Sequence, residues 1–178
     1  NLTVEEDGDK MDNKLLPGLH LGVNLLIPVA TDFYFHPGLL FSGKGSKVEM
    51  DDATLRLSYI ELPVNFLYRG KVGEGFVLIG FGPYLGYGIG GKIKSDGVEV
   101  DVKFKNTVEE NDSEDVFYLK TFDAGANIFV GYELSTGLFF QLNSQLGLLN
   151  LMPDYPGESG DDSSIKNTGF GLSVGYRF

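Results

Sequence analysis

Large apolar residues alternate with small or polar ones along most of this chain, and the pattern is clearest over the last ten residues. Phe170, Leu172, Val174, Tyr176 and Phe178 are large and apolar, and every position between them is Gly, Ser or Arg. Successive side chains of a β-strand point to opposite faces, so one face of this segment is apolar and the other is small or polar. Small residues would leave a core unfilled. The pattern therefore favours an apolar face that points outward into lipid.

Six further segments alternate in the same way, and all seven are rich in β-branched and aromatic residues with Gly or Pro at the joins. The predicted strands cover residues 15–28, 33–42, 54–69, 77–90, 119–134, 138–148 and 165–178. The mean hydropathy is −0.03 and no run of eighteen apolar residues exists, which excludes a bundle of membrane helices. Alternation gives a β-barrel the same neutral average.

The predicted connections alternate between short and long. Those near 28–32, 70–75 and 135–137 are short, whereas those at 43–53, 95–118 and 152–165 are long. Outer-membrane barrels combine short periplasmic turns with longer extracellular loops. We therefore expect one domain over residues 1–178, with an acidic extracellular loop at 1–14 followed by seven strands over 15–178.

Acidic residues are concentrated in the long connections. The net charge is −11, and twenty of the 25 acidic residues lie in the four long loops. Such charge ordinarily keeps loops solvated, and it argues against nucleic acid as a partner. The alternative is a site for Ca²⁺ or another divalent cation that bridges lipopolysaccharide phosphates, although the spacing does not match an EF-hand. The candidate ligands are Asp7, Asp9, Asp12, Glu109, Glu110 and Asp112.

The inward face of the predicted strands carries polar and charged residues. An eight-stranded barrel is just wide enough for its side chains to fill, and buried charges must be paired. We therefore predict a salt-bridged polar plug, with Arg69, Glu133 and Arg177 toward the periplasmic end. Inward glycines leave room for water, so a narrow channel for small polar solutes stays as the alternative. The predicted plug comprises Glu61, Asn65, Arg69, Asn127, Glu133, Gln141, Asn143, Gln145 and Arg177.

Catalytic and cofactor chemistry find little support. His20 and His36 are predicted to point inward on adjacent strands, where a metal or acid/base pair with Glu61 or Asp123 is the alternative to ordinary interior histidines. A metal site needs a third ligand at fixed geometry, which no spacing supplies. No serine lies in a nucleophile elbow, and the absence of Cys removes disulfides and thiolate metal sites. We expect no enzymatic activity and no cofactor.

The count of seven strands conflicts with the even number of single-chain bacterial barrels. A bare strand edge is not tolerated in hydrocarbon. We therefore expect an eight-stranded barrel whose first strand is largely absent from this sequence, except for a tail at Asn1-Leu2-Thr3. A closing strand donated by another chain is the alternative.

Four stretches resemble the strand motifs of the PorT-like outer-membrane β-barrel family: residues 59–68 (YIELPVNFLY), 80–88 (GFGPYLGYG), 122–126 (FDAGA) and 175–178 (GYRF). The resemblance covers roughly residues 15 to 178. It implies an antiparallel up-and-down barrel in the outer membrane of a Gram-negative bacterium, in contact with membrane lipid and lipopolysaccharide. The terminal alternation Phe170, Leu172, Val174, Tyr176 and Phe178 resembles the insertion signal read by the barrel assembly machinery.

Two functions remain open at this point. The first is a structural or interaction barrel whose acidic loops meet another envelope protein. The second is a porin-like transport barrel. Outward aromatic residues near the short turns predict a girdle at the membrane interface; they are Phe33, Phe35, Phe66, Tyr68, Tyr132, Phe140, Tyr176 and Phe178.

Overall fold

Hydrogen-bonded β-strands make up all the extended regular structure in the described part of the chain. The computed structural model describes residues 2–6, 9–10, 13–16, 18–48, 53–95, 97–108, 112–113, 116–153 and 164–178. Within these ranges there is no helix of the length and apolarity that crossing a membrane requires.

The strands differ widely in length, and the three longest follow one another in the chain. They are β1 (Leu2–Glu6), β2 (Asp9–Lys10), β3 (Asn13–Leu15), β4 (His20–Asn24), β5 (Ile27–Ala30), β6 (Phe33–Val48), β7 (Ala53–Val72), β8 (Gly75–Ser95), β9 (Val98–Phe104), β10 (Phe117–Leu119), β11 (Phe122–Glu133), β12 (Leu138–Gly147) and β13 (Ser164–Tyr176).

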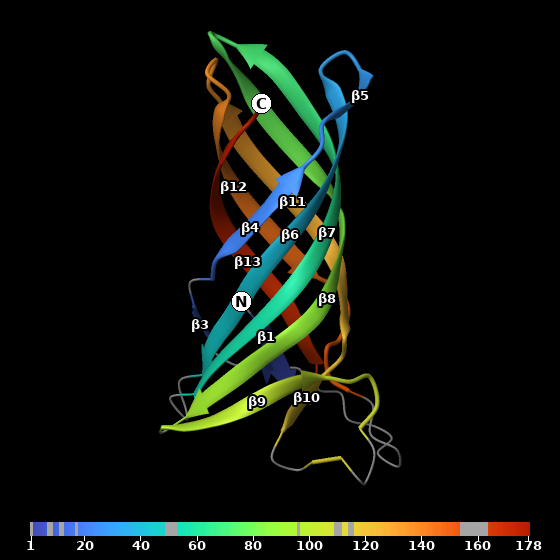
Figure 1. The fold of residues 1–178 in the computed structure, drawn as a ribbon, viewed down its shortest axis with the longest axis vertical. Coiled ribbons are helices and arrows are strands. Elements are labelled where there is room, and N and C mark those ends of the chain that lie inside the picture. Colours follow the sequence, from blue (N-terminus) through green and yellow to red (C-terminus); the bar gives the residue numbers. More distant parts are fainter. Residues whose placement is uncertain are drawn as a thin grey trace.

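Most of the long strands pair with the long strand that follows them in the chain: β6 with β7, β7 with β8, β11 with β12 and β12 with β13. The order is β2-β1-β13-β12-β11-β8-β7-β6-β3, with β4 and β5 also paired to β6 and with β9 beside β8. All these pairs are antiparallel, and only β9 with β10 is parallel among the described pairs. The sheet curls around a long axis, with the short turns at the top of Figure 1 and the long connections at the bottom. The predicted class, an all-β antiparallel barrel, is confirmed.

Among the described residues the barrel wall has an open line, which we call the seam. It lies between β4 and residues 168–176 of β13. On the edges away from the seam, β4 pairs with β6 and β13 pairs with β12. On the edge that borders the seam, residues 164–167 of β13 pair with β1. No pairing across the seam exists among the described residues.

Pairing extends further than the sequence pattern predicts. Residues 43–48, predicted as loop, continue β6, while 95–118 contains β9 and most of β10, and 1–14 contains β1, β2 and most of β3. Residues 43–48 lack the alternation, whereas Val98–Phe104 alternates between apolar and charged residues; backbone hydrogen bonds do not depend on side-chain polarity, so the ladder continues in both segments. The predicted strand 15–28 is divided among β3, β4 and β5, with an irregular register between Pro28 and Ala30. Pro28 has no N–H to donate to the ladder.

The outer face of the barrel is a band of exposed apolar side chains. Along β8, Leu85 is 61% exposed, whereas its inward neighbour Tyr84 is buried. The same contrast recurs on the other long strands, as the alternation predicts. Exposed members of the band include Leu21, Val23, Leu62, Ile79, Phe81, Ile128, Val130, Leu142, Leu172 and Val174.

Aromatic side chains collect at the short-turn end of this band. The Phe33 ring stacks on Phe66 with centroids 5.4 Å apart and lies 5.2 Å from the Tyr68 ring. The rings of Tyr176 and Phe178 are 5.1 Å apart. The turns beneath them are tight, with left-handed backbone at Gly73 and Gly137. The sequence prediction placed these aromatic residues at this end.

We predict that Leu85→Arg destabilises the barrel in lipid vesicles by about 2–4 kcal/mol, because the guanidinium would face the hydrocarbon. Val98→Arg is the matched control. Val98 is 64% exposed, but it lies at the tip of the β8–β9 hairpin, beyond the span of a transmembrane strand. Urea unfolding in vesicles measures both variants. Equal effects of the two substitutions would contradict the position assigned to the apolar band.

Candidate functional site

The inward side chains of β7 describe the barrel interior from the long-loop end to the short-turn end. In order they are Leu57, Tyr59, Glu61, Pro63, Asn65, Leu67 and Arg69. All are buried except Arg69, which is partly buried. The interior is therefore apolar, then charged, then polar, then apolar and finally charged again.

An ion cluster lies at the short-turn end. Arg69 Nη2 donates to Glu133 Oε1 over 2.7 Å and its Nε donates to Oε2 over 3.1 Å. Arg177 Nε donates to the same Oε2 over 2.7 Å. The Arg69 guanidinium also lies 3.4 Å from the centroid of the Phe76 ring. One buried carboxylate thus joins β7, β11 and the end of the chain, as the pairing rule for buried charges requires.

An apolar layer lies next to this cluster, on the side of the long-loop end. Leu67, Leu78 and Phe129 are buried together, with Leu26, Tyr34 and Phe139 packed against them. The Phe129 ring lies over Gly80, its register partner on β8, and a Cβ added there would overlap the ring. Phe139 covers Gly175 in the same way. These inward glycines make room for aromatic rings of neighbouring strands, whereas the sequence suggested room for water.

A second charged cluster lies toward the long-loop end. Lys44 Nζ is 2.6 Å from Glu61 Oε1 and 3.3 Å from Asp123 Oδ2. The Lys44 ammonium also lies 5.2 and 5.0 Å from the ring centroids of Tyr59 and Tyr84, within range of cation–π attraction. All five side chains are buried.

Asp123 is the acceptor that joins this cluster across the barrel. Its Oδ2 accepts from Tyr84 OH at 3.0 Å and from Asn167 Nδ2 at 2.7 Å, as well as from Lys44. These partners come from β6, β8 and β13, and two of those strands are not neighbours of β11. The contacts therefore cross the lumen.

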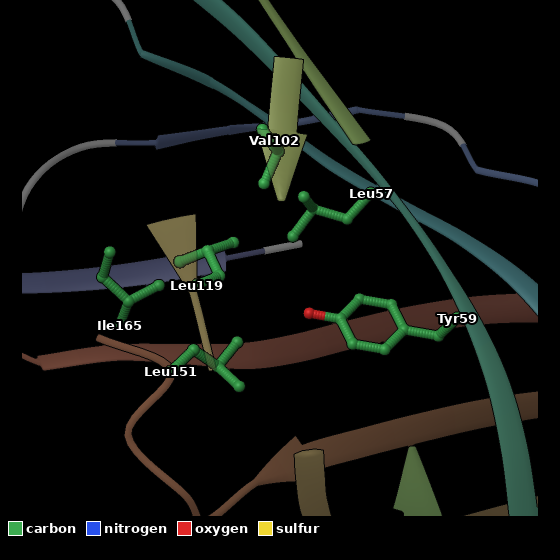
Figure 2. Packing of buried hydrophobic residues seen from close by; sticks show 6 residues of the cluster. All are labelled: Leu57, Tyr59, Val102, Leu119, Leu151 and Ile165. Carbon is green, nitrogen blue, oxygen red and sulfur yellow. The ribbon is translucent and has the colours of Figure 1, made fainter. Parts of the chain in front are cut away.

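An apolar cap covers the Lys44 cluster at the long-loop end (Figure 2). Leu57 and Tyr59 of β7 meet Val102 of β9 and Leu119 of β10. The far side of the cap consists of Leu151 and Ile165, and Leu151 N–H donates to the Ile165 carbonyl at 2.8 Å. Because β7 and β13 lie on separate parts of the wall, this cluster spans the barrel mouth.

A cavity of about 920 Å³ with a mixed polar and apolar lining lies between the Lys44 cluster and the apolar layer and reaches the seam. At the seam His20 Nε2 is 2.7 Å from Ser173 Oγ, which accepts a second hydrogen bond from Asn143 Nδ2 at 2.6 Å. Polar side chains on its wall are His36, Asn65, Asn127, Gln141, Asn143 and Gln145.

The predicted plug residues are divided between these sites. Glu61 belongs to the Lys44 cluster, where Gln145 Nε2 donates to its Oε2 at 3.3 Å. Arg69, Glu133 and Arg177 form the ion cluster at the short-turn end. The predicted Asn and Gln side chains line the cavity. His20 and His36 do not form a pair: His20 faces Ser42 on β6, six residues from His36 and thus roughly 20 Å along the strand.

The cation candidates lie mostly outside the described residues, namely Asp7, Asp12, Glu109 and Glu110. Asp9 lies in β2, and the Asp112 carboxylate accepts from Lys105 Nζ at 2.6 and 2.9 Å. The described residues contain no group of three His, Asp or Glu able to hold a metal ion. The proposed insertion signal, Phe170, Leu172, Val174, Tyr176 and Phe178, is exposed.

Sequence reasoning missed Lys44, Tyr84 and Asn167 as interior residues. Lys44 was assigned to a loop, although it continues the inward phase of His36 and Ser42 at even positions. Tyr84 was not assigned to the interior because only the glycines of residues 77–90 were predicted to point inward. Extending the alternation by two residues beyond Ser42 would have placed Lys44 inside.

We predict that Glu133→Gln destabilises the barrel by about 2–3 kcal/mol, because the change leaves two partly buried guanidinium groups without a counter-charge. Chemical unfolding of the refolded protein measures the loss.

The control is Glu99→Gln on the exposed β8–β9 hairpin. The hydrogen bond and charge of Lys92 hold the pKa of Glu99 below its ordinary value, but both groups are solvent-exposed. We expect no measurable change in stability from this substitution. A Glu133 variant as stable as the control would show that the ion cluster does not hold the strands together.

Comparison with known proteins agrees with this architecture. The family model described as "Outer membrane protein beta-barrel domain" matches residues 2–152. No curated protein and no solved structure matches the chain. The match covers most of the strands that form the wall and both charged clusters except for Asn167 and Arg177. With its exposed apolar band and polar interior, the chain belongs to the outer-membrane β-barrel domain family and is an integral outer-membrane barrel.

Proposed function

We propose that this barrel is a structural or protein-interaction element with a closed interior. The supporting observation is the succession of layers across the lumen. The ion cluster of Glu133, the apolar layer of Leu67, Leu78 and Phe129, the Lys44 cluster and the apolar cap follow one another along the axis. A solute would have to displace close-packed side chains at each apolar layer.

The proposal places the long-loop end outside a Gram-negative cell. Its support is the asymmetry of connections, with short turns at one end and long acidic segments at the other. In this orientation the apolar band contacts membrane lipid and lipopolysaccharide. The exposed alternation of β13 is then available to the barrel assembly machinery during insertion.

The proposed role involves no catalysis. Ser173 and His20 are hydrogen-bonded, but the contact joins two strand edges across the seam, and Asn143 donates to the serine and not to the imidazole. A nucleophile with its base also needs a third group that orients the base. No such group is bonded to His20 within the described residues.

The cavity of about 920 Å³, whose wall carries several amide side chains, favours a second candidate, a narrow channel for small polar solutes. The cavity lies between the two apolar layers. The channel therefore requires those layers to open, which electrical recording detects.

We predict that the mature protein in planar bilayers gives no steady unit conductance, because packed apolar side chains exclude ions and water. Replacing Leu67, Leu78 and Phe129 together by alanine removes the apolar layer near the short-turn end and is expected to produce ion leakage. Phe81→Ala is the control, since Phe81 is 59% exposed on the outer face and Phe129 only 6%. A steady unit conductance of the unmodified protein would favour the channel over the closed barrel.

We also expect the acidic loops to carry the interaction with another envelope protein. The variant to test replaces Glu109, Glu110, Glu114 and Asp115 by their amides, and the measurement is covalent cross-linking on intact cells. Loss of a cross-linked complex is the expected result, because the loops would no longer attract a basic surface. Glu74→Gln, at an exposed short turn, is the control. A complex that survives loop neutralisation would mean that the charge serves solvation alone.

A further inference from the structure

The outer wall changes from apolar to basic at the long-loop end of the apolar band. Along β8 the last outward apolar side chain is Ile89, and the exposed side chains that follow are Lys92 and Lys94. On β7 the outward side chains pass from Ile60 to Arg56 within four residues, a rise of about 13 Å along the strand. The headgroup layer is roughly 5–8 Å thick. Because the strands tilt and these side chains are long and flexible, their charges reach this layer.

The charged side chains lie in neighbouring rows across three strands at the lower end of Figure 1. In one row Arg56 of β7 lies opposite Lys92 of β8, and Lys92 lies opposite Asp101 of β9. In the next row Lys94 lies opposite Glu99. Alternation along β9 places Lys103 on the same face, and all these side chains are exposed. We call this surface the basic face, and it comprises Arg56, Lys92, Lys94, Glu99, Asp101 and Lys103.

The basic face has more cations than anions, with one arginine and three lysines against two carboxylates. The chain as a whole has a net charge of −11. Like charges directly opposite each other destabilise a sheet, and Arg56 and Lys92 occupy such positions. Lys92 is ion-paired with Glu99, whereas Arg56 and Lys103 form no ion pair within the described ranges. An external anion would relieve this repulsion.

A cleft of about 420 Å³ joins the basic face to the apolar band. It lies where β8 changes its neighbour, since Tyr87 pairs with β11 and Gly91 pairs with β9. Its lining includes Lys103 together with Tyr87 and Ile89, two side chains that are exposed on the outer wall. An ammonium beside aromatic and aliphatic side chains suits a ligand that has both an anionic head and an apolar part.

We propose that the basic face binds the phosphate groups of lipopolysaccharide in the leaflet at the long-loop end. A guanidinium pairs with a phosphate through two parallel N–H donors, and the lysines add positive charge around it. Lipid is favoured over an acidic protein because the basic rows directly adjoin the apolar band, where headgroups already lie. The choice of lipopolysaccharide rests on the orientation proposed above.

This mode of binding differs from a cation bridge. Carboxylates of the long acidic segments need a divalent cation between themselves and a phosphate, whereas Arg56, Lys94 and Lys103 need none. Binding through the basic face therefore persists when divalent cations are removed.

The first test titrates the mature protein, purified in non-ionic detergent with EDTA, with bisphosphorylated lipid A, and native mass spectrometry measures the bound lipid. The variant replaces Arg56, Lys94 and Lys103 together by glutamine. One basic residue near an anionic surface strengthens binding about fivefold, so we expect the affinity to fall about 100-fold. Heat-dependent gel migration verifies that the variant folds.

Two controls accompany this titration. Lys94→Gln alone is expected to weaken binding about fivefold, whereas Lys71→Gln, at an exposed position of the short-turn end, is expected to leave it unchanged. Fully dephosphorylated lipid A is expected to bind the unmodified protein about 100-fold more weakly than the bisphosphorylated form. Equal affinity of the unmodified protein and the triple variant would overturn the proposal, as would binding that EDTA abolishes. A triple variant that keeps lipid A but loses a cross-linked acidic protein would also overturn it.

The second test separates the binding site from the orientation. Residues 1–178 contain no Cys, so Val98→Cys and Glu74→Cys each introduce a single thiol, at the tip of the β8–β9 hairpin and at a short turn. On intact cells we expect a membrane-impermeant maleimide to label position 98 and not position 74. The reverse result would overturn the assignment to lipopolysaccharide and the proposed orientation together. The titration in detergent and the conductance of the lumen do not depend on orientation, so each fails independently.

Discussion

Backbone hydrogen bonding in an apolar medium is the constraint on which this structure depends. Hydrocarbon offers no partner to an N–H or C=O group, so each strand that crosses it must be paired along both edges. The long ladders of β6, β7, β8, β11 and β12 satisfy this requirement without help from side chains. The choice of side chain is then set by the face, so the outer surface is uniformly apolar, whereas the inner surface alternates between charged clusters and apolar layers.

Charges on the inner face act as a second set of connections between strands that the ladder does not join. Glu133 binds Arg69 and Arg177, so one carboxylate serves two cations. At the opposite end Lys44 serves two carboxylates, Glu61 and Asp123. With all groups ionised the two clusters carry opposite net charges, and the described interior charges balance as a whole. Each cluster depends on its single central residue, which has no substitute nearby.

Part of this arrangement could be predicted from the sequence. A period of two assigns each residue to a face, and the rule that buried charges pair brings Arg69, Glu133 and Arg177 together without coordinates. The Lys44 cluster was missed, because residues 43–48 lack the apolar outward positions that reveal a strand and were therefore assigned to a loop, although Lys44 continues the inward phase of Ser42. Backbone pairing continues through these residues because hydrogen bonds between N–H and C=O groups do not depend on side-chain polarity.

The glycines illustrate a different limit of sequence reasoning. A row of inward glycines indicates empty space, and empty space inside a barrel suggests water. Whether it holds water depends on the neighbouring strand, and the register places Phe129 opposite Gly80 and Phe139 opposite Gly175. The rings fill the volume that the glycines leave. The register, which single-sequence periodicity does not fix, decides between a wet lumen and a packed one, and here it favours the packed interior on which the proposed function rests.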